Sequence, residues 1–520
     1  MLRPTFMGYE ASKSALYTAQ KAMDITGQNA SNINTEGYTR QRADQVSVHQ
    51  GAFVSRYSIN MTVYAGMGTS IEGVQQLRNK QLDTAFRNEY CSTGYFDKKS
   101  TMLSSIEDIM QELDDGKDGN GYNLKYALQE VHKALQDFSS NANSPAQANV
   151  LATSFDNLSR TLNQKYKSLD DLQDTYIFEM RDKIESMNQD FAKIADLNKR
   201  IENSILTNSY TEQYGPNELL DERNLIIDNL SRMGELKVTY KDNGRVDISI
   251  NGHMAVEGGE YDKLIYEVVE NKATESRAVT LDWKSSGNDA FLGKGEIMAM
   301  EEVINGRGPK PLNSNENTIK GILYYRDKLD SLAQSLADTF NNILPQIDEN
   351  KNIMKDENGN TMYRKIFGAT MGDGYVDPDS KITGKNLSIT NALSANSSYL
   401  IYDDDNRDNS YILSMLDALS TQKHAIGSYG DNFNGTFEDF INEYSVSLGD
   451  DLSYSDSQLG ASMMVAQEII DTRYSISGVS ETEETTNMLV FNKAFQSASR
   501  MMTTFDSMLD YIVNVIGAIR

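Results

Sequence analysis

The chain has 520 residues, of which 39% are hydrophobic and 24% charged, a composition typical of a folded protein and not of a disordered one. Its formal net charge of −26 argues against a nucleic-acid partner, because binding to phosphates needs clustered lysine and arginine. The single cysteine, Cys91, excludes an intrachain disulfide, and the most apolar terminal run, Tyr511 to Ile519, is far shorter than the ~20 residues of a membrane-spanning helix.

The first predicted element is a helix over residues 9–33, a stretch rich in alanine, serine, threonine and glutamine. Its larger apolar residues have spacings compatible with one helical face: Leu16, Ala19, Met23, Ala30 and Ile33. The helix runs into Asn32-Ile33-Asn34-Thr35-Glu36-Gly37-Tyr38, where asparagine, threonine and glycine favour a turn. Strand-like alternation follows at Val46-Ser47-Val48 and from Tyr57 to Val63, and a helical pattern covers about 74 to 113.

The longest predicted helix begins at Asn143-Ser144-Pro145, where Ser144 is a suitable N-cap and proline suits the first helical position. Neither glycine nor proline interrupts the chain again before Gly215, and one apolar stripe runs from Leu151 to Ile205. About sixty helical residues span roughly 90 Å at 1.5 Å each. This length indicates a rod-shaped subunit.

The pattern changes at residue 235. Val238 and Tyr240, then Asn243-Gly244, then Val246, Ile248 and Ile250 predict a hairpin with an Asn-Gly turn. Helical periodicity returns over 317–344, residues 345–410 are rich in Asp, Asn and Gly, and the chain from 437 to 520 is mostly helical.

The last forty residues carry an apolar repeat in steps of three and four, which are the residues we predict for an assembly interface: Met488, Phe491, Phe495, Ala498, Met502, Phe505, Leu509, Ile512, Ile516 and Ile519. A mean period of 3.5 residues requires the helix to coil around a partner helix. A stripe of this kind is often ordinary core, but its strict period at the extreme end of the chain favours assembly with neighbouring subunits. The helix at about 9–33 is the expected first partner.

The predicted fold class is mainly α with inserted β domains (α+β). We expect a long antiparallel helical bundle or coiled coil built from both chain ends, with one or two β-rich insertions. The predicted terminal coiled coil comprises residues 1–60 with 478–520 and is disordered in the free monomer. The predicted helical rod comprises residues 61–232 with 312–344 and 411–477. The inserted β domain covers residues 233–311, and the second insertion covers residues 345–410.

Catalytic and metal-binding patterns are weak. The four histidines (His49, His132, His253 and His424) are scattered singly, and Cys91 has no adjacent base. A calcium loop starting at Asp348, with Asn350 and Asn352, has Ile353 where glycine is needed and Gly359 where glutamate is needed. Asp403-Asp404-Asp405 is best explained as a solvated acidic loop. We therefore predict no enzyme, no cofactor and no metal.

The stretch Gln28-Asn29-Ala30-Ser31-Asn32-Ile33-Asn34-Thr35-Glu36-Gly37-Tyr38-Thr39-Arg40-Gln41 resembles the amino-terminal signature of flagellar rod, hook and hook-associated proteins. The end of the chain from Ser477 resembles the matching terminal helix. Two interior segments resemble the hook-associated protein 1 (FlgK) family in particular: Glu218 to Asn224 before the hairpin, and Gly321 to Asp327 before a helix with Ala337-Asp338-Thr339-Phe340-Asn341.

The resemblance implies a structural subunit of the bacterial flagellum at the junction of hook and filament, exported by the flagellar type III system. It implies a transient cytoplasmic stage and an extracellular destination. The implied partners are further copies of the chain, the hook protein, a second junction protein and an export chaperone that binds the C-terminal helix. In the N-terminal region the implied interface comprises Leu16, Ala19, Met23, Ala30, Asn32, Ile33, Asn34, Gly37 and Tyr38.

Three other functions remain open at this point. The chain could be another axial subunit of hook or rod, or an axial subunit with a surface hydrolase in an inserted domain, which would need a cleft with carboxylates of shifted pKa. It could also be a cytosolic coiled-coil scaffold, which would require stable association of its purified terminal helices.

Overall fold

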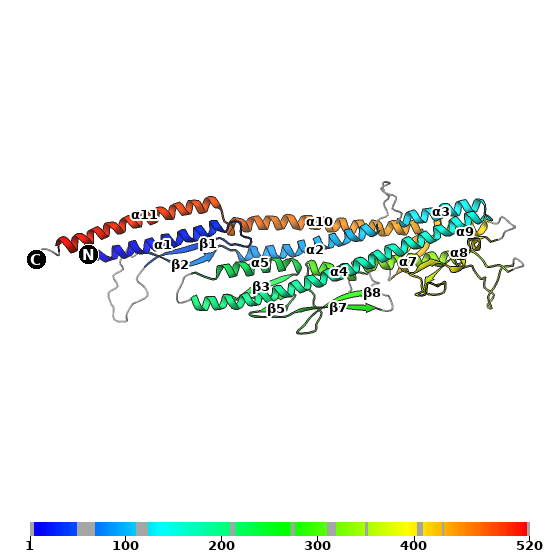
Figure 1. The fold of residues 1–520 in the computed structure, drawn as a ribbon, viewed down its shortest axis with the longest axis horizontal. Helices are drawn as coiled ribbons and strands as arrows, with labels where there is room; N and C mark the ends of the chain where they lie inside the picture. The colour runs from blue at the N-terminus through cyan, green and yellow to red at the C-terminus, as the bar shows by residue number, and fades with distance from the viewer. Residues whose placement is uncertain are drawn as a thin grey trace.

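Both ends of the chain lie at the same end of a long rod in the computed structural model (Figure 1). The structure describes residues 5–48, 68–110, 123–208, 214–271, 276–308, 319–348, 352–402, 409–428 and 431–516. The fold is mainly α-helical with several small antiparallel sheets, which confirms the predicted class.

Three long helices run along the rod: α2 (Lys80–Met110), α4 (Pro145–Asn208) and α10 (Phe437–Ser477). The 64 residues of α4 confirm the single long helix predicted from the sequence. At its start the Ser144 carbonyl accepts from the amide of Ala148 at 3.0 Å, and the hydroxyl of Ser144 accepts from the amide of Gln147 at 3.4 Å. The side chains of the predicted stripe are largely buried and form one side of a continuous core.

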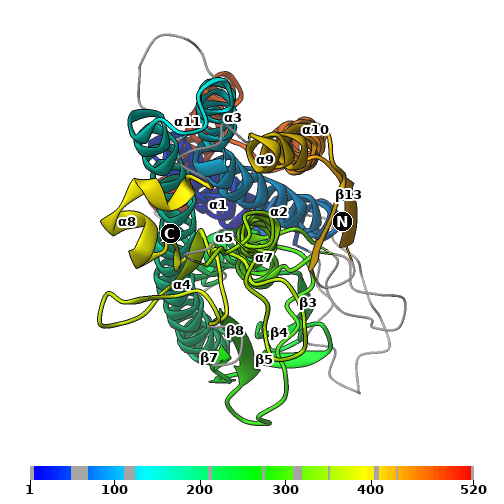
Figure 2. The same cartoon turned by 90° about the vertical axis from the view of Figure 1, so that its right-hand side faces the viewer.

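Shorter helices complete the rod around this frame: α3 (Leu124–Ser140), α5 (Asn217–Met233), α6 (Glu296–Asn305), α7 (Ile322–Phe340), α8 (Asn391–Ala395), a 3-10 turn at Ser397–Leu400, and α9 (Ser410–Ser420). The view along the rod places α10 at one side of the bundle and the strands β5, β7 and β8 at the opposite side (Figure 2). The helix predicted over 317–344 corresponds to α7.

The predicted hairpin is confirmed by β3 (Leu236–Tyr240) and β4 (Val246–Ile250), which pair antiparallel, and Gly244 in their turn has φ +80°. β5 (His253–Glu257) and β6 (Glu260–Tyr261) extend this sheet, and β7 (Leu264–Asn271) pairs with β8 (Ser276–Trp283) as a separate ribbon. Helix α4 holds both sheets through asparagine side chains. Asn198 donates to the Val246 carbonyl at 2.8 Å, and Asn188 donates to the Leu264 carbonyl at 2.9 Å.

The second predicted insertion contains β9 (Phe367–Thr370), β10 (Val376–Asp377) and β11 (Leu387–Ile389), and a hairpin of β12 (His424–Ser428) and β13 (Asp431–Gly435) follows it. The Asp348 carboxylate accepts from the amide of Asn352 at 2.8 Å and closes a turn. Asn350 and Asp403-Asp404-Asp405 lie outside the described residues.

The terminal elements are α1 (Thr5–Ser31), β1 (Gln41–Ser47), β2 (Thr69–Gln76), α11 (Glu481–Tyr511) and a π-helical turn at Ile512–Ile516. The helix that we expected from about residue 74 begins only at Lys80, because Val74 to Gln76 pair with β1. His49 and the strand pattern from Tyr57 to Val63 lie outside the described residues. The disorder expected for the ends of the free monomer stays a prediction, and it is the alternative to the packed terminal helices on which the tests of register and hydrogen exchange below depend.

Within the described ranges, no helix is long and apolar enough to cross a membrane. The same residues contain no group of three or more His, Cys, Asp or Glu side chains that could hold a metal ion.

The core around α4 can be tested with two phenylalanines of the same helix. Phe155 is fully buried and lies 5.2 Å and 5.3 Å from the rings of Phe340 and Phe367, measured between centroids. Phe155→Ala should lower the free energy of unfolding by about 3–5 kcal/mol, because it leaves a cavity. The matched change Phe178→Ala, at a side chain 56% exposed, should cost under about 1 kcal/mol. Urea unfolding followed by circular dichroism measures both, and equal losses would contradict the assignment of this core.

Candidate assembly interface at the joined chain ends

Helices α1 and α11 pack antiparallel over most of their length at the end of the rod (Figure 1). The partner expected for the C-terminal stripe, a helix near residues 9–33 of the same chain, is therefore present. In α11, Ala498 is buried, and five larger members of the stripe are half-buried: Phe491, Phe495, Met502, Phe505 and Leu509. Met488 and Ile512 are exposed, the side chain of Ile516 is not described, and Ile519 lies outside the described residues.

Helix α1 presents small side chains to this stripe. Six buried residues and the half-buried Ala15 follow one another at steps of three and four: Gly8, Ser12, Ala15, Ala19, Ala22, Thr26 and Asn29. The close approach is clearest at Gly8, where an added Cβ would lie 2.4 Å from Cζ of Phe505. Large side chains on one helix thus pack over small ones on the other.

The N-terminal residues predicted for assembly lie only partly on this face. Ala19 is buried in it, whereas Leu16, Met23, Ala30 and Ile33 are half-buried, and their assembly role stays a prediction. Sequence reasoning followed the larger apolar residues and missed the small-residue repeat. The repeat itself, with glycine, serine, alanine and threonine at alternating steps of four and three from Gly8, was the signal that could have found the face.

A buried polar layer joins the inner ends of the two helices. Asn29 and Glu484 are each 2% exposed. The Asn29 amide nitrogen donates to a Glu484 carboxylate oxygen at 3.2 Å and to the Gln41 carbonyl at 2.9 Å. Its carbonyl oxygen accepts from the Tyr38 hydroxyl at 2.9 Å and from the Gln41 amide at 3.0 Å. The guanidinium of Arg40 donates to the other Glu484 oxygen at 2.8 Å, so both charges of the layer are paired.

Arg40 holds the connection between α10 and α11 as well. Its amide donates to the Ser477 carbonyl at 2.9 Å, and its guanidinium also binds the exposed Glu483 at 2.7 Å. Arg40 of the N-terminal segment therefore binds both the end of α10 and the start of α11. The segments are more than 430 residues apart in sequence, which is why no local pattern revealed the contact.

The turn after α1 delivers Tyr38 and Arg40 to this layer. The Asn32 side chain donates to the Gln28 carbonyl at 2.9 Å and accepts from the Thr35 hydroxyl at 3.1 Å, while Asn34 is exposed. Gly37 has φ +78°, and a Cβ there would lie 3.2 Å from Leu225, so both backbone and space favour glycine. Burial is the main cause that raises the pKa of the Tyr38 phenol, so its hydroxyl stays a donor at neutral pH.

Helix α5 links the terminal segment to the β domain. The Glu218 carboxylate accepts from the Gln28 side chain at 2.8 Å, and Asp221 accepts from the Thr39 amide at 3.2 Å. On the other side the buried Arg223 donates to the Asn198 side chain at 2.8 Å and to the carbonyl of Gly244, in the β3–β4 turn, at 2.7 Å. Burial lowers the pKa of Arg223 to about 10, and the guanidinium remains charged. The Glu218–Asn224 motif of α5 thus connects the N-terminal segment, helix α4 and the β3–β4 turn.

A second charged cluster holds α10 to the rod just beyond this motif. Arg473 of α10 binds Asp228 of α5 at 2.7 Å and Asp83 of α2 at 3.0 Å. Arg87 binds the same Asp228 at 2.7 Å, and Arg78 binds Asp83 at 2.6 Å. Three guanidinium groups and two carboxylates therefore connect three helices, and pairing on this scale offsets the cost of burying the charges.

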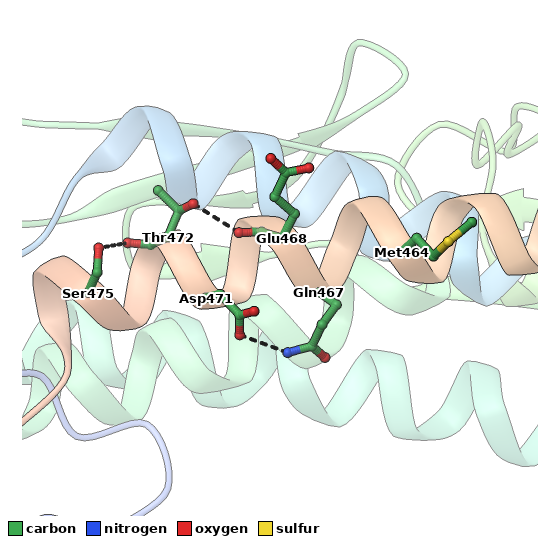
Figure 3. Close-up of a pocket in the computed structure, with 6 residues that line it drawn as sticks. All are labelled: Met464, Gln467, Glu468, Asp471, Thr472 and Ser475. Atoms are coloured by element: carbon green, nitrogen blue, oxygen red, sulfur yellow. Dashed lines mark hydrogen bonds between the residues drawn. The ribbon is translucent and has the colours of Figure 1, made fainter.

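A shallow surface hollow lies along the outer face of α10 (Figure 3). All its lining residues belong to this one helix: Met464, Gln467, Glu468, Asp471, Thr472 and Ser475. The side chains of Gln467, Asp471, Thr472 and Ser475 are bonded within the helix, as in the Gln467–Asp471 bond at 2.9 Å. The site with convergent interactions is the joined chain ends and not this hollow.

Known proteins match the chain over the parts just described. A family model described as the flagellar hook-associated protein FlgK helical domain matches residues 103–352, and one described as the flagellar basal body rod FlgEFG protein C-terminal matches residues 473–515. Flagellar hook-associated protein 1 of Bacillus subtilis is 28% identical over 99% of both chains.

These matches support a relationship between the chain and flagellar hook-associated protein 1. Flagellar hook-associated protein 1 of Salmonella typhimurium is 22% identical over 63% of this chain, and the match covers 54% of that relative. A solved structure of the flagellar hook junction protein FlgK from Burkholderia pseudomallei aligns with 55% of this chain and 46% of its own, with 17% identity and a TM-score of 0.42.

The link between Asp221 and Thr39 predicts a pH dependence of stability. Burial raises the pKa of the Asp221 carboxyl to about 6, against the hydrogen bonds from Thr39 and the charge of Arg78. The folded chain then holds this proton more tightly than the unfolded chain, so stability falls as the pH rises from about 4 to 6, by at most about 3 kcal/mol. Asp221→Asn should remove that fall, whereas Asp171→Asn, at an exposed position of α4, should retain it. Urea unfolding at pH 4 to 7 measures the slopes, and parallel slopes in Asp221→Asn and the unchanged chain would exclude Asp221 as the cause.

Proposed function

We propose that this chain is a structural subunit of the bacterial flagellum that forms the junction between hook and filament. The proposal includes export by the flagellar type III system, a transient cytoplasmic stage and assembly through the terminal helices. It extends to this chain the name carried by its relatives, among them the Bacillus subtilis protein that it matches over nearly its whole length. The proposed partners are other copies of the chain, the hook protein, a second junction protein and an export chaperone on α11.

The observation that carries the proposal is the incomplete burial of α11. Its seam packs on α1, yet large apolar side chains elsewhere on the helix and in the π-helical turn that follows it are 51–66% exposed: Leu489, Val490, Met501, Met508, Tyr511 and Val513. Soluble monomers rarely expose contiguous apolar surface without an interaction partner. An end that is packed on one side and apolar on others suits a subunit whose terminal pair packs against equivalent pairs in its neighbours.

The position of the charged and β-rich parts supports the same proposal. The terminal pair projects from one end of the rod, and the sheets β3–β6 and β7–β8 lie along the side opposite α10 (Figures 1 and 2). In a tubular assembly with the terminal pairs at the inner wall, this arrangement would leave the sheets on the outside. The proposed domains follow the same division: a terminal coiled coil, a helical rod, the β domain within 233–311 and the insertion within 345–410.

Removal of residues 488–520 tests the proposal. Because the rod has its own core, the shortened chain should remain a folded, soluble monomer by circular dichroism and size-exclusion chromatography. Cells with this chain as their only copy should bear hooks without filaments in electron micrographs. A control chain ending at Ile516 keeps the described helix and should restore filaments. Filaments on cells that carry only the 488–520 deletion would contradict the proposed function.

A further inference from the structure

Two contacts, one near each end of the terminal helix pair, define a single alignment. Gly8 lies against Phe505, and Asn29 bonds to Glu484. Gly8 and Asn29 are 21 residues apart, and so are Glu484 and Phe505. Because 21 residues are three heptads, the two helices keep one constant antiparallel register between these contacts.

The seam between the two contacts does not by itself select that register. The constant register sets Ala22 opposite Phe491 and Ala15 opposite Ala498, so small residues of α1 face mostly large residues of α11. The polar members of the α1 seam bond within their own helix: the Ser12 hydroxyl donates to the Gly8 carbonyl and the Thr26 hydroxyl to the Ala22 carbonyl, both at 2.9 Å. A displacement by one heptad would again set small residues against large ones.

The polar layer distinguishes the observed register from registers displaced by one heptad. Glu484 occupies a position of the α11 repeat, four residues before Met488, and Asn29 continues the α1 repeat three residues after Thr26. Displacement by seven residues would place Glu484 against Ala22 or beyond the end of α1 at Ser31. The carboxylate would then lose Asn29 and Arg40, and the Asn29 amide nitrogen would keep its bond to the Gln41 carbonyl but lose the acceptor of its other N–H. A single polar residue in an apolar seam fixes register in coiled coils for the same reason.

We propose that Asn29 and Glu484 are specificity-determining residues that fix the register of α1 against α11. Arg40 neutralises the layer, and the small seam residues allow close packing without choosing an alignment. The inference rests on the proposed function only in linking this register to assembly. The register itself is a property of the single chain.

Disulfide trapping in the purified full-length chain tests the inference, in a Cys91→Ala background. Ala15→Cys with Ala498→Cys reports the observed register. Ala22→Cys with Ala498→Cys reports displacement by one heptad in one direction, and Ala15→Cys with Phe491→Cys reports displacement in the other. With diamide as oxidant, the first pair should form a disulfide at least about tenfold faster than either displaced pair. After Asn29→Leu with Glu484→Leu, at least one displaced pair should approach the rate of the first.

The matched control is Glu483→Leu, which removes the neighbouring carboxylate and its bond to Arg40 at an exposed position. It should leave the trapping pattern unchanged. The inference is overturned if the displaced disulfides stay rare in the leucine double variant, or if they form equally fast in the Glu483→Leu control. Equal rates of disulfide formation for all three cysteine pairs in the Cys91→Ala background would also overturn it. Circular dichroism verifies that α1 and α11 remain helical, and Asn29→Leu alone serves if the double variant does not fold. Because trapping is read on the monomer, its failure is separate from a failure to join hook and filament.

Discussion

The buried carboxylate of Glu484 is the constraint on which the arrangement of the chain ends depends. It belongs to the last helix, and its two partners, Asn29 and Arg40, belong to the first forty residues. Breaking a buried ion pair by removal of one partner costs about 3–5 kcal/mol, because the other charge stays buried without compensation. The two ends of the chain are therefore held together by electrostatics at one end of their contact and by close packing of small against large side chains along the rest.

The same segment transmits this constraint to the rod. Thr39 is bonded to Asp221 of α5, and α5 continues through Arg223 to the β3–β4 turn and through Asp228 to Arg473 of α10. Each link is a buried or half-buried polar contact, and the links from Thr39 to Asp221 and from Asp228 to Arg473 join elements distant in sequence. The position of the terminal pair relative to the rod thus follows from a series of specific contacts. In an assembly that uses the terminal pair, these contacts would fix the orientation of the rod relative to that pair.

Local patterns predicted those parts of the fold in which the deciding interactions are local. The 64-residue helix α4 follows from an unbroken apolar stripe, and the β3–β4 hairpin follows from Asn243-Gly244 between alternating residues. The start of α2 was misplaced because pairing with the distant β1 extends β2 to Gln76. Likewise the sequence predicted the α11 seam from its 3.5-residue repeat, but the partners of this seam on α1 are small residues that carry little hydrophobic signal. The role of Glu484 could not be predicted locally, because its partners Asn29 and Arg40 lie more than 440 positions away.

The most direct measurement of the central claim is a double-mutant cycle between Arg40→Met and Glu484→Met, read by hydrogen exchange of the α11 amides. Exchange reports the local opening of this helix without unfolding the rod. If the buried pair holds the ends together, the coupling should reach at least about 2 kcal/mol, roughly thirtyfold in the opening constant. Effects that add within about 0.5 kcal/mol, or α11 amides that exchange without protection in the unchanged chain, would contradict the account.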